Sequence, residues 1–298
     1  MTSAVWWTIG GLVVAVLSPP FLRRAMRHGA DAGLLLIGWA VLACLSFTAI
    51  ASPAVAIVVH GCWLSPDTGL PGWVDAVAGT TSAAAVVIAG IRGTWRFAST
   101  KRYRRHVHAR HAELAWILTG AAPRKDTVLW LPTAEPHAYS LAGEPPLVVM
   151  SDGLRDCLDP VALSAVTSHE NAHIFRRHHW FVAVAQALSA GIGWLPLARQ
   201  SPALVRTLIE LDADAHAVRL HGSLPLRQAI QALRYAPAPT VSLGIAADAA
   251  ELRLTRLMAH APSSAPRTRR SVAAGAAMMI ATTLVTTALL FGAGVITC

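Results

Sequence analysis

The chain has 298 residues, of which 54% are hydrophobic and 14% are charged, and its mean hydropathy is +0.48. That composition is too apolar for an ordinary soluble domain of this length and predicts a membrane protein. The formal net charge of +9 could suit a nucleic-acid-binding protein, but basic loops beside membrane spans account for much of the excess. Contact with anionic membrane lipids is therefore expected, and direct binding of nucleic acid is not.

Four stretches are long and apolar enough to span a membrane, namely residues 4–22, 32–59, 74–91 and 271–296. The first does not resemble a cleaved signal peptide, because its arginines follow the apolar run and do not precede it. Basic residues also follow the third stretch and precede the fourth, whereas the loop at 61–72 has none. The positive-inside rule then predicts an N-terminal membrane region at 1–98, a cytoplasmic region at 99–266 and a C-terminal span at 267–298, with both termini outside.

Three histidines lie in the basic stretch after the third span, His106, His108 and His111. They could hold a second metal ion or form a solvated helix face at the membrane interface, and the pattern favours the helix face. The cysteines match no Cys-rich zinc pattern. Cys157 is expected to be free in a reducing cytoplasm, whereas Cys62 and Cys298 would both lie outside and could pair.

Short β-prone runs separated by proline and glycine come next along the chain. Residues 127–131, 137–141 and 147–150 predict a small three-stranded sheet. A helix should follow, because Asp159 is a good N-cap and Pro160 suits the first helical position. Its apolar stripe leads directly into the next motif.

The strongest signal in the chain is the H-E-x-x-H motif formed by His169, Glu170 and His173. On a helix the two histidines leave the same face one turn apart, which suits two ligands of one tetrahedral Zn²⁺ ion. Glu170 then lies beside the open coordination position, where it can take a proton from water whose pKa the metal has lowered. An accidental match on a solvent-facing helix is the simpler alternative. The motif predicts zinc-dependent hydrolysis of peptide bonds.

After the motif, residues 181–197 form an apolar stretch that is nearly long enough to span. A single crossing here would put the motif and the next helix on opposite sides of the membrane, where they could not share a metal site. We therefore expect a helix and a turn that are buried in the domain or lie in the membrane interface. A second capped helix is predicted to begin at Ser201-Pro202 and to run towards Leu220.

A catalytic zinc ion needs a third protein ligand, and the sequence offers two candidates. His179 has the metzincin spacing, but Arg176 occupies the position of the glycine that breaks the helix in that motif. The run from Arg176 to His179 is instead expected to form a basic collar at the membrane surface. Glu210 on the second helix can reach the metal, and Asp214 shares its face and can hold a histidine N–H. A solvated acidic face is the alternative interpretation of these carboxylates.

H-E-x-x-H at 169–173 followed by E-x-x-x-D at 210–214 resembles the gluzincin membrane peptidases of the HtpX type. Two further elements stand where those proteins have a substrate-aligning edge strand and a Gly-Leu element, namely His137-Ala138-Tyr139 and Asp152-Gly153-Leu154. More specifically, the chain resembles the BlaR/MecR antirepressor metallopeptidases. The features that carry this resemblance are the three N-terminal spans, the Arg176-Arg177-His178-His179-Trp180 run and the Trp194-Leu195-Pro196-Leu197 turn.

The resemblance implies a multi-pass α-helical protein of the bacterial inner (cytoplasmic) membrane with an α+β gluzincin-type zinc peptidase domain, in a short form without a penicillin-binding sensor domain. It implies one Zn²⁺ ion on His169, His173 and Glu210, with Glu170 as the base. Asp214 would support the ligands by accepting a histidine N–H without binding the metal itself. The substrate strand would align along His137, Ala138 and Tyr139. The implied partners are membrane lipids and a protein substrate, such as a cytoplasmic DNA-binding repressor cleaved in signal transduction. An HtpX-like quality-control peptidase and a non-catalytic zinc-containing transducer are the alternatives.

Overall fold

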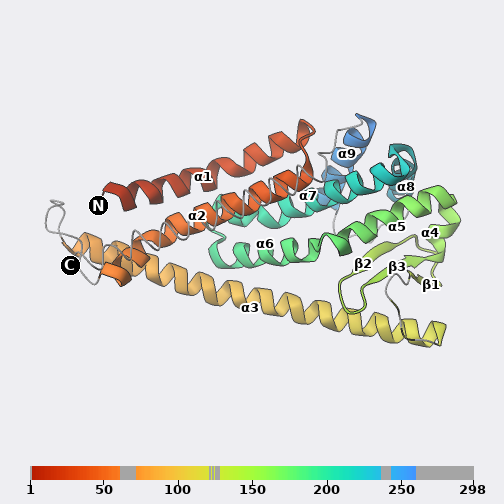
Figure 1. Cartoon of the computed structure of the whole chain (residues 1–298), viewed down its shortest axis with the longest axis horizontal. Helices are drawn as coiled ribbons and strands as arrows, with labels where there is room; N and C mark the ends of the chain where they lie inside the picture. The colour runs from red at the N-terminus through yellow and green to blue at the C-terminus, as the bar shows by residue number, and fades with distance from the viewer. Residues whose placement is uncertain are drawn as a thin grey trace.

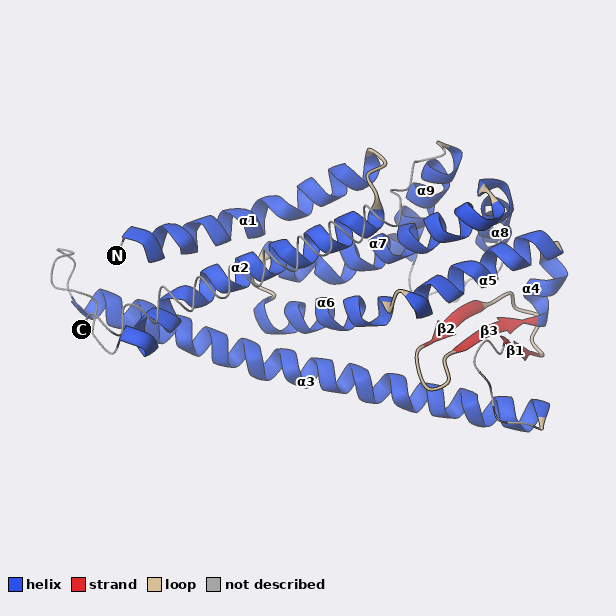
Figure 2. Cartoon of the chain, in the orientation of Figure 1, coloured by secondary structure: helices blue, strands red, loops and turns tan. Residues whose placement is uncertain are grey.

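The computed structural model describes residues 2–60, 72–120, 122, 124, 128–235 and 243–259. They are mostly helical and include one small mixed sheet (Figure 1, Figure 2). Three long helices come first, α1 (Thr2–Arg27), α2 (Ala32–His60) and α3 (Gly72–Thr119). The sheet lies beside the end of α3 that is furthest from the N-terminus (Figure 1).

Two described segments are long and apolar enough to cross a membrane, Ile9–Arg27 in α1 and Ala32–Ala51 in α2. On α1 several large apolar side chains face outward, among them Leu17 at 60% and Phe21 at 63% exposure. The third predicted span, 74–91, forms part of α3 but is not one of these segments. The fourth span lies outside the described residues, as do Cys62 and Cys298.

The helix α3 continues for about 40 Å beyond Arg92, given the rise of 1.5 Å per residue, and its far end holds the sheet. His108 Nε2 lies 2.7 Å from the carbonyl oxygen of Pro145, and His111 Nε2 lies 2.8 Å from the hydroxyl of Tyr139. Both expectations for these two histidines are therefore wrong. They form neither a metal site nor a solvated face, because they dock the sheet onto α3.

The predicted three-stranded sheet is present, with strands β1 (Val128–Leu131), β2 (Ala138–Leu141) and β3 (Leu147–Ser151). The strand order is β1-β3-β2, with β3 parallel to β1 and antiparallel to β2. The central strand β3 is buried throughout, as its continuous apolar run requires. β2 is consequently an edge strand of the described sheet.

The short helix α4 (Asp152–Cys157) and the motif helix α5 (Pro160–Phe175) follow the sheet. Gly153 cannot carry a side chain, because a Cβ there would lie 2.0 Å from the carbonyl oxygen of Ala134. The predicted cap of α5 is confirmed, since Asp159 Oδ1 accepts a hydrogen bond from the backbone N–H of Ala162 at 2.7 Å. Cys157 is free, as expected.

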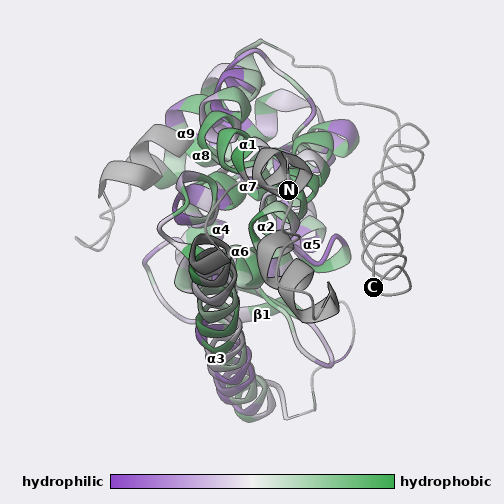
Figure 3. Ribbon diagram, turned by 90° about the vertical axis from the view of Figure 1, so that its left-hand side faces the viewer, coloured by the Kyte–Doolittle hydropathy of each residue, from purple (hydrophilic) through white to green (hydrophobic). Residues whose placement is uncertain are grey.

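Two antiparallel helices, α6 (His178–Ile192) and α7 (Pro196–His221), provide the helix and turn expected at 181–197. This hairpin packs against the N-terminal helices, and Figure 3 shows α1, α2, α6 and α7 clustered together while α3 runs obliquely to one side. Gly191 approaches α3 so closely that a Cβ would lie 2.7 Å from the carbonyl oxygen of Ala89. On the other side, Trp39 Nε1 donates to Ser201 Oγ at 2.8 Å. Because the hairpin turns back, α5 and α7 lie side by side.

The predicted start of the second helix at Ser201-Pro202 is wrong, because α7 begins at Pro196 and passes through Pro202. Leu197 and Ala198 lie in the core shared with α1 and α2, at 2% and 4% exposure. Burial of this first turn outweighs the backbone hydrogen bond that Pro202 cannot donate.

Two further helices complete the described chain, α8 (Ser223–Tyr235) and α9 (Leu243–Met258). α8 packs against α5, and α9 packs against α7 and α8. The guanidinium of Arg256 in α9 donates to the carbonyl oxygens of Met26, Gly29 and Ala30. These bonds tie α9 to the turn between α1 and α2.

Candidate metal centre

α5 presents His169 and His173 on one face, one turn apart, and their Nε2 atoms lie 3.2 Å from each other. Both rings are well shielded, with 7% and 15% of the side chains exposed. In their neutral forms two imidazoles can share at most one proton across such a contact. The space between the rings therefore suits a cation that both nitrogens can bind.

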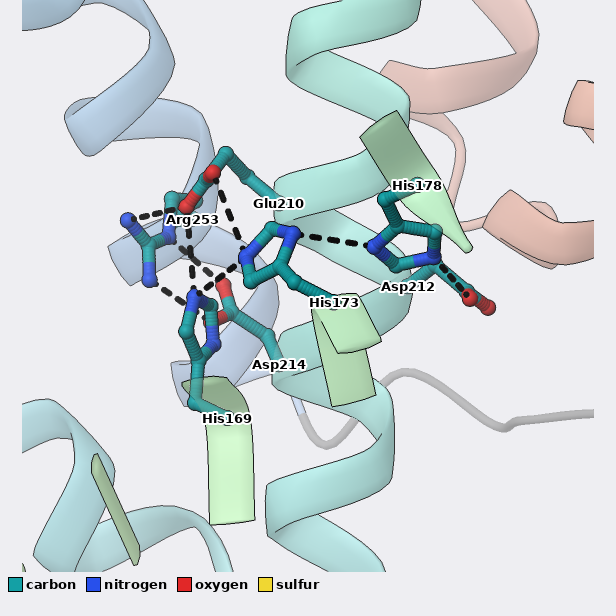
Figure 4. A network of polar contacts seen from close by, with 7 residues as sticks. All are labelled: His169, His173, His178, Glu210, Asp212, Asp214 and Arg253. Atoms are coloured by element: carbon teal, nitrogen blue, oxygen red, sulfur yellow. Dashed lines mark hydrogen bonds and ion pairs between the residues drawn. The ribbon is translucent and has the colours of Figure 1, made fainter. Parts of the chain in front are cut away.

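Glu210 reaches the same place from α7 (Figure 4). Its Oε2 lies 3.3 Å from His169 Nε2, and its Oε1 lies 3.5 Å from His173 Nε2. The three residues are the one group of potential metal ligands found among the described residues. A tetrahedral zinc ion with bonds of about 2.0–2.1 Å keeps its ligand atoms about 3.3–3.4 Å apart. The observed separations fit that geometry.

Asp214 lies behind His169, one turn after Glu210 on α7 (Figure 4). Its Oδ1 lies 2.9 Å from His169 Nδ1, although the ring N–H is not aimed directly at it. A modest turn of the ring would complete a hydrogen bond that leaves Nε2 free for a metal. Asp214 is 4% exposed. The alternative of a solvated acidic face is therefore wrong for this carboxylate.

His173 has an outer partner as well, and that partner is His178 (Figure 4). His178 Nδ1 lies 3.0 Å from His173 Nδ1, and its Nε2 lies 3.1 Å from Asp212 Oδ2. If His173 binds a metal through Nε2, its Nδ1–H donates to His178, which must then donate through Nε2–H to Asp212. One consistent set of tautomers connects the buried carboxylate to the ligand.

The expected basic collar is thus wrong for two of its members. His178 is 2% exposed, and the guanidinium of Arg176 pairs with the buried Asp212. The reason is a sharp break after α5, where Arg177 adopts a left-handed conformation with a φ of 53°. A glycine at 176 is therefore not needed for the chain to turn, but the turn brings His178 towards His173. His179 is not part of the potential ligand group.

Sequence patterns did not reveal Arg253, which enters the centre from α9 (Figure 4). Its Nε and Nη2 donate to the two carboxylate oxygens of Asp214 at 2.8 and 2.7 Å, and its Nη1 lies 3.0 Å from Glu210 Oε2. The helical pattern of 243–258 could have placed Arg253 on a helix face. No local signal connects it with a carboxylate far earlier in the chain.

The electrostatics of the centre favour a bound cation. Burial alone would lower the pKa of His169, but Asp214 and Glu210 outweigh it and raise that pKa to about 10. Burial lowers the pKa of His173 to about 3. Burial opposes the ionisation of Glu210, yet His169 and Arg253 hold its pKa well below the ordinary range. Without a metal, the ring of His169 is therefore a positively charged imidazolium near neutral pH. A metal that binds its Nε2 must displace the extra proton.

Glu170 lies beside this group and is 9% exposed. Burial raises the pKa of its carboxyl, while His169 and a hydrogen bond from Ser140 act in the opposite direction. Once the extra proton of His169 has been displaced, the three carboxylates of Glu170, Glu210 and Asp214 remain around the guanidinium of Arg253. That excess of carboxylates suits a divalent ion, and the donor set of two imidazoles and one carboxylate is typical of catalytic zinc.

A cavity of about 610 Å³ opens onto the centre and is lined by Glu170, by the ligand group and by the edge strand β2. Ala138 and Tyr139 lie on its wall, where the predicted substrate strand would align. His137 is not among the residues that line the cavity. Its ring lies 3.2 Å from Glu135 on the surface, so only part of the predicted substrate strand faces the centre.

The comparison with protein families finds that residues 101–201 are similar to Peptidase family M48. The matched segment contains His169, Glu170 and His173, and it ends before Glu210. It supports a peptidase, and with the His/His/Glu group it supports a metallopeptidase. No curated protein and no solved structure matches the chain.

Proposed function

We propose that this protein is an integral membrane zinc endopeptidase with a cytoplasmic active site, and that it cleaves a repressor-like cytoplasmic protein in signal transduction. One observation carries the proposal: His169, His173 and Glu210 converge at separations that suit zinc, with Glu170 beside them. A purely structural zinc site has no need of a buried carboxylate next to its ligands. The match of residues 101–201 to a peptidase family supports the same reaction.

A zinc ion on these ligands would supply a Lewis acid that polarises the scissile carbonyl and lowers the pKa of water. Glu170 accepts the proton of the attacking water on its carboxylate and returns it to the leaving amine. Its raised pKa suits a group that must take and then give a proton near neutral pH. Asp214 and His178 hold His169 and His173 so that both Nε2 atoms face the metal position.

The substrate would bind as an extended strand beside β2. An edge strand has backbone groups available for pairing, and a peptide that pairs with it gains affinity through main-chain hydrogen bonds. β2 also lines the cavity that contains Glu170. Pairing along β2 would therefore bring the scissile bond to the base and the metal.

Membrane insertion is supported by the exposed apolar side chains of α1, by the apolar segments in α1 and α2, and by the arginines in the last turns of α1. The tip of the α6–α7 hairpin is also apolar, with Trp194 57% exposed. The basic residues that flank the predicted spans support a cytoplasmic position for residues 99–266. A repressor as the target follows from the resemblance to the BlaR/MecR peptidases.

The test compares the cytoplasmic proteomes of cells that carry the wild-type protein or Glu170→Gln. Glu170→Gln keeps the metal ligands, so fragments that appear only with the wild type report cleavage and not the presence of the protein. We expect fragments of one or a few DNA-binding proteins. Fragments of many unrelated unfolded chains would favour a quality-control peptidase, and identical proteomes would contradict the peptidase function.

A further inference from the structure

The cavity beside the metal centre has two unlike sides. Its α8 side is apolar, with Leu226, Ile230 and Leu233 on the wall. Arg104 of α3, which lies on the opposite side of α5 from α8 (Figure 1), lines another part of the space together with His179 of α6. A substrate that lies along β2 therefore meets an apolar wall on one side and a cation on the other.

Arg104 is held in this position by α6. Its Nη1 donates to the carbonyl oxygen of His179 at 3.2 Å. Nearby on α3, Thr100 Oγ1 donates to Gln186 Oε1 at 3.1 Å and fixes the two helices against each other. The guanidinium is therefore positioned before any substrate arrives, which reduces the entropy cost of binding.

The charge of Arg104 has no counterpart among the described residues. Its Nε is buried and makes no hydrogen bond, and no ion pair there includes it. The carboxylates that line the cavity are Glu170 and Glu210 at the metal centre, and the second arginine, Arg253, is already paired. A partly buried guanidinium without a counter-charge is costly, and a carboxylate that enters the cavity would supply that charge.

The neighbouring histidine is suited to the same ligand. Burial, Arg104 and Arg177 lower the pKa of His179 to about 4, so its ring is neutral near neutral pH. Its buried Nδ1 also makes no hydrogen bond within the described residues. A neutral imidazole can donate one hydrogen bond to a carboxylate without adding a competing charge.

We propose, on the basis of the peptidase function proposed above, that Arg104 forms a carboxylate-binding subsite that selects substrates with an acidic side chain, or a chain terminus, at a fixed distance from the cleaved bond.

A lipid phosphate fits this position less well. Arg104 lies twelve residues after Arg92, the first basic residue beyond the third predicted span, which is about 18 Å along the helix. The headgroup layer extends only about 5–8 Å beyond the hydrocarbon core. The guanidinium is therefore expected below the headgroups, at the level of the cleft.

The experiment uses the full-length, zinc-loaded protein in nanodiscs and a proteome-derived peptide library, with cleavage sites read by mass spectrometry. Half of the library has free C-termini and half has amidated C-termini. The readout is the ratio of cleavage between acidic and neutral residues at each position. The variants are Arg104→Gln and Arg104→Glu, and the matched control is Arg105→Glu, an exposed neighbour that does not line the cavity.

For the wild type and Arg105→Glu we expect about a tenfold preference for Asp or Glu at one position, the size of a charge-assisted hydrogen bond. Arg104→Gln should remove the preference, and Arg104→Glu should shift it to Lys and Arg. If the preference requires a free C-terminus, the ligand is the chain terminus; if amidation leaves it intact, the ligand is a side chain.

Three results would overturn the subsite. They are cleavage without an acidic preference, a preference that survives in Arg104→Gln, and a loss of bound anionic lipid in Arg104→Gln with an unchanged cleavage profile. A capture experiment with zinc-loaded Glu170→Gln protein needs no catalysis. Arg104-dependent retention of acidic peptides there, with no cleavage by the wild type, would sustain the subsite while the peptidase function fails.

Discussion

His178 offers the most specific test of how the centre is built, because it connects His173 to a buried carboxylate. His178→Ala removes the contact of 3.0 Å to His173 Nδ1 and that of 3.1 Å to Asp212 Oδ2. Loss of an outer partner of a metal-binding histidine typically lowers metal affinity by about 10–100-fold. The side chain of His173 is 15% exposed, so water can replace the lost acceptor in part. We therefore expect a loss near the lower end, about tenfold.

The assay is competition for Zn²⁺ between the purified protein and a chelator of known affinity. His178→Gln should recover part of the affinity, because its amide oxygen can accept the N–H of His173. The matched control is His179→Ala, which changes the next residue without touching His173. Wild-type affinity in His178→Ala would refute the role of His178, and so would an equal loss in the control.

Three further predictions concern the stability of the protein and its orientation in the membrane. Arg253→Leu should destabilise the metal-free protein by about 3 kcal/mol, because Asp214 and Glu210 lose a buried partner. Bound zinc should restore much of this stability, because it replaces the lost positive charge. Equal shifts in the melting temperature with and without a chelator would argue against this prediction. His179→Gln should lose less stability than the wild type as the pH falls from about 6.5 towards about 4. The reason is that the pKa of His179 is lower in the folded protein than in the unfolded chain, so protonation favours unfolding of the wild type. Parallel curves of melting temperature against pH for the two proteins would contradict this. The third prediction concerns topology and uses a protein from which Cys62 and Cys298 have been removed. In intact cells, Thr68→Cys should react with a membrane-impermeant thiol reagent and Thr127→Cys should not. The opposite labelling would mean that the protein has the reverse orientation.

Local signals were sufficient to predict the elements that carry the two motifs. Asp159 and Pro160 mark the start of α5 because a cap and a preset φ act within one turn. Glu210 and Asp214 share a face because they are four residues apart on a helix, and the hairpin brings that face to His169. Helical periodicity and the requirement that both helices stay on one side of the membrane made Glu210 a candidate, and the family resemblance favoured it over His179.

The parts that sequence reasoning missed depend on tertiary contacts. Pro202 has the pattern of a helix start, but the burial of Leu197 extends α7 to Pro196. The turn after α5 uses Arg177 in a conformation that glycine usually adopts, so the absence of a glycine was misleading. Arg253 meets Asp214 only because α9 packs on α7. Neither local propensity nor spacing encodes that contact.

The most direct test of the central claim is the zinc content of purified variants of the ligand group. Glu210→Ala should lose most of the bound zinc, His179→Ala should keep nearly all of it, and Glu170→Gln should keep zinc while losing peptide cleavage. Retention of zinc in Glu210→Ala together with its loss in His179→Ala would contradict the assignment of Glu210 and restore His179 as the third ligand.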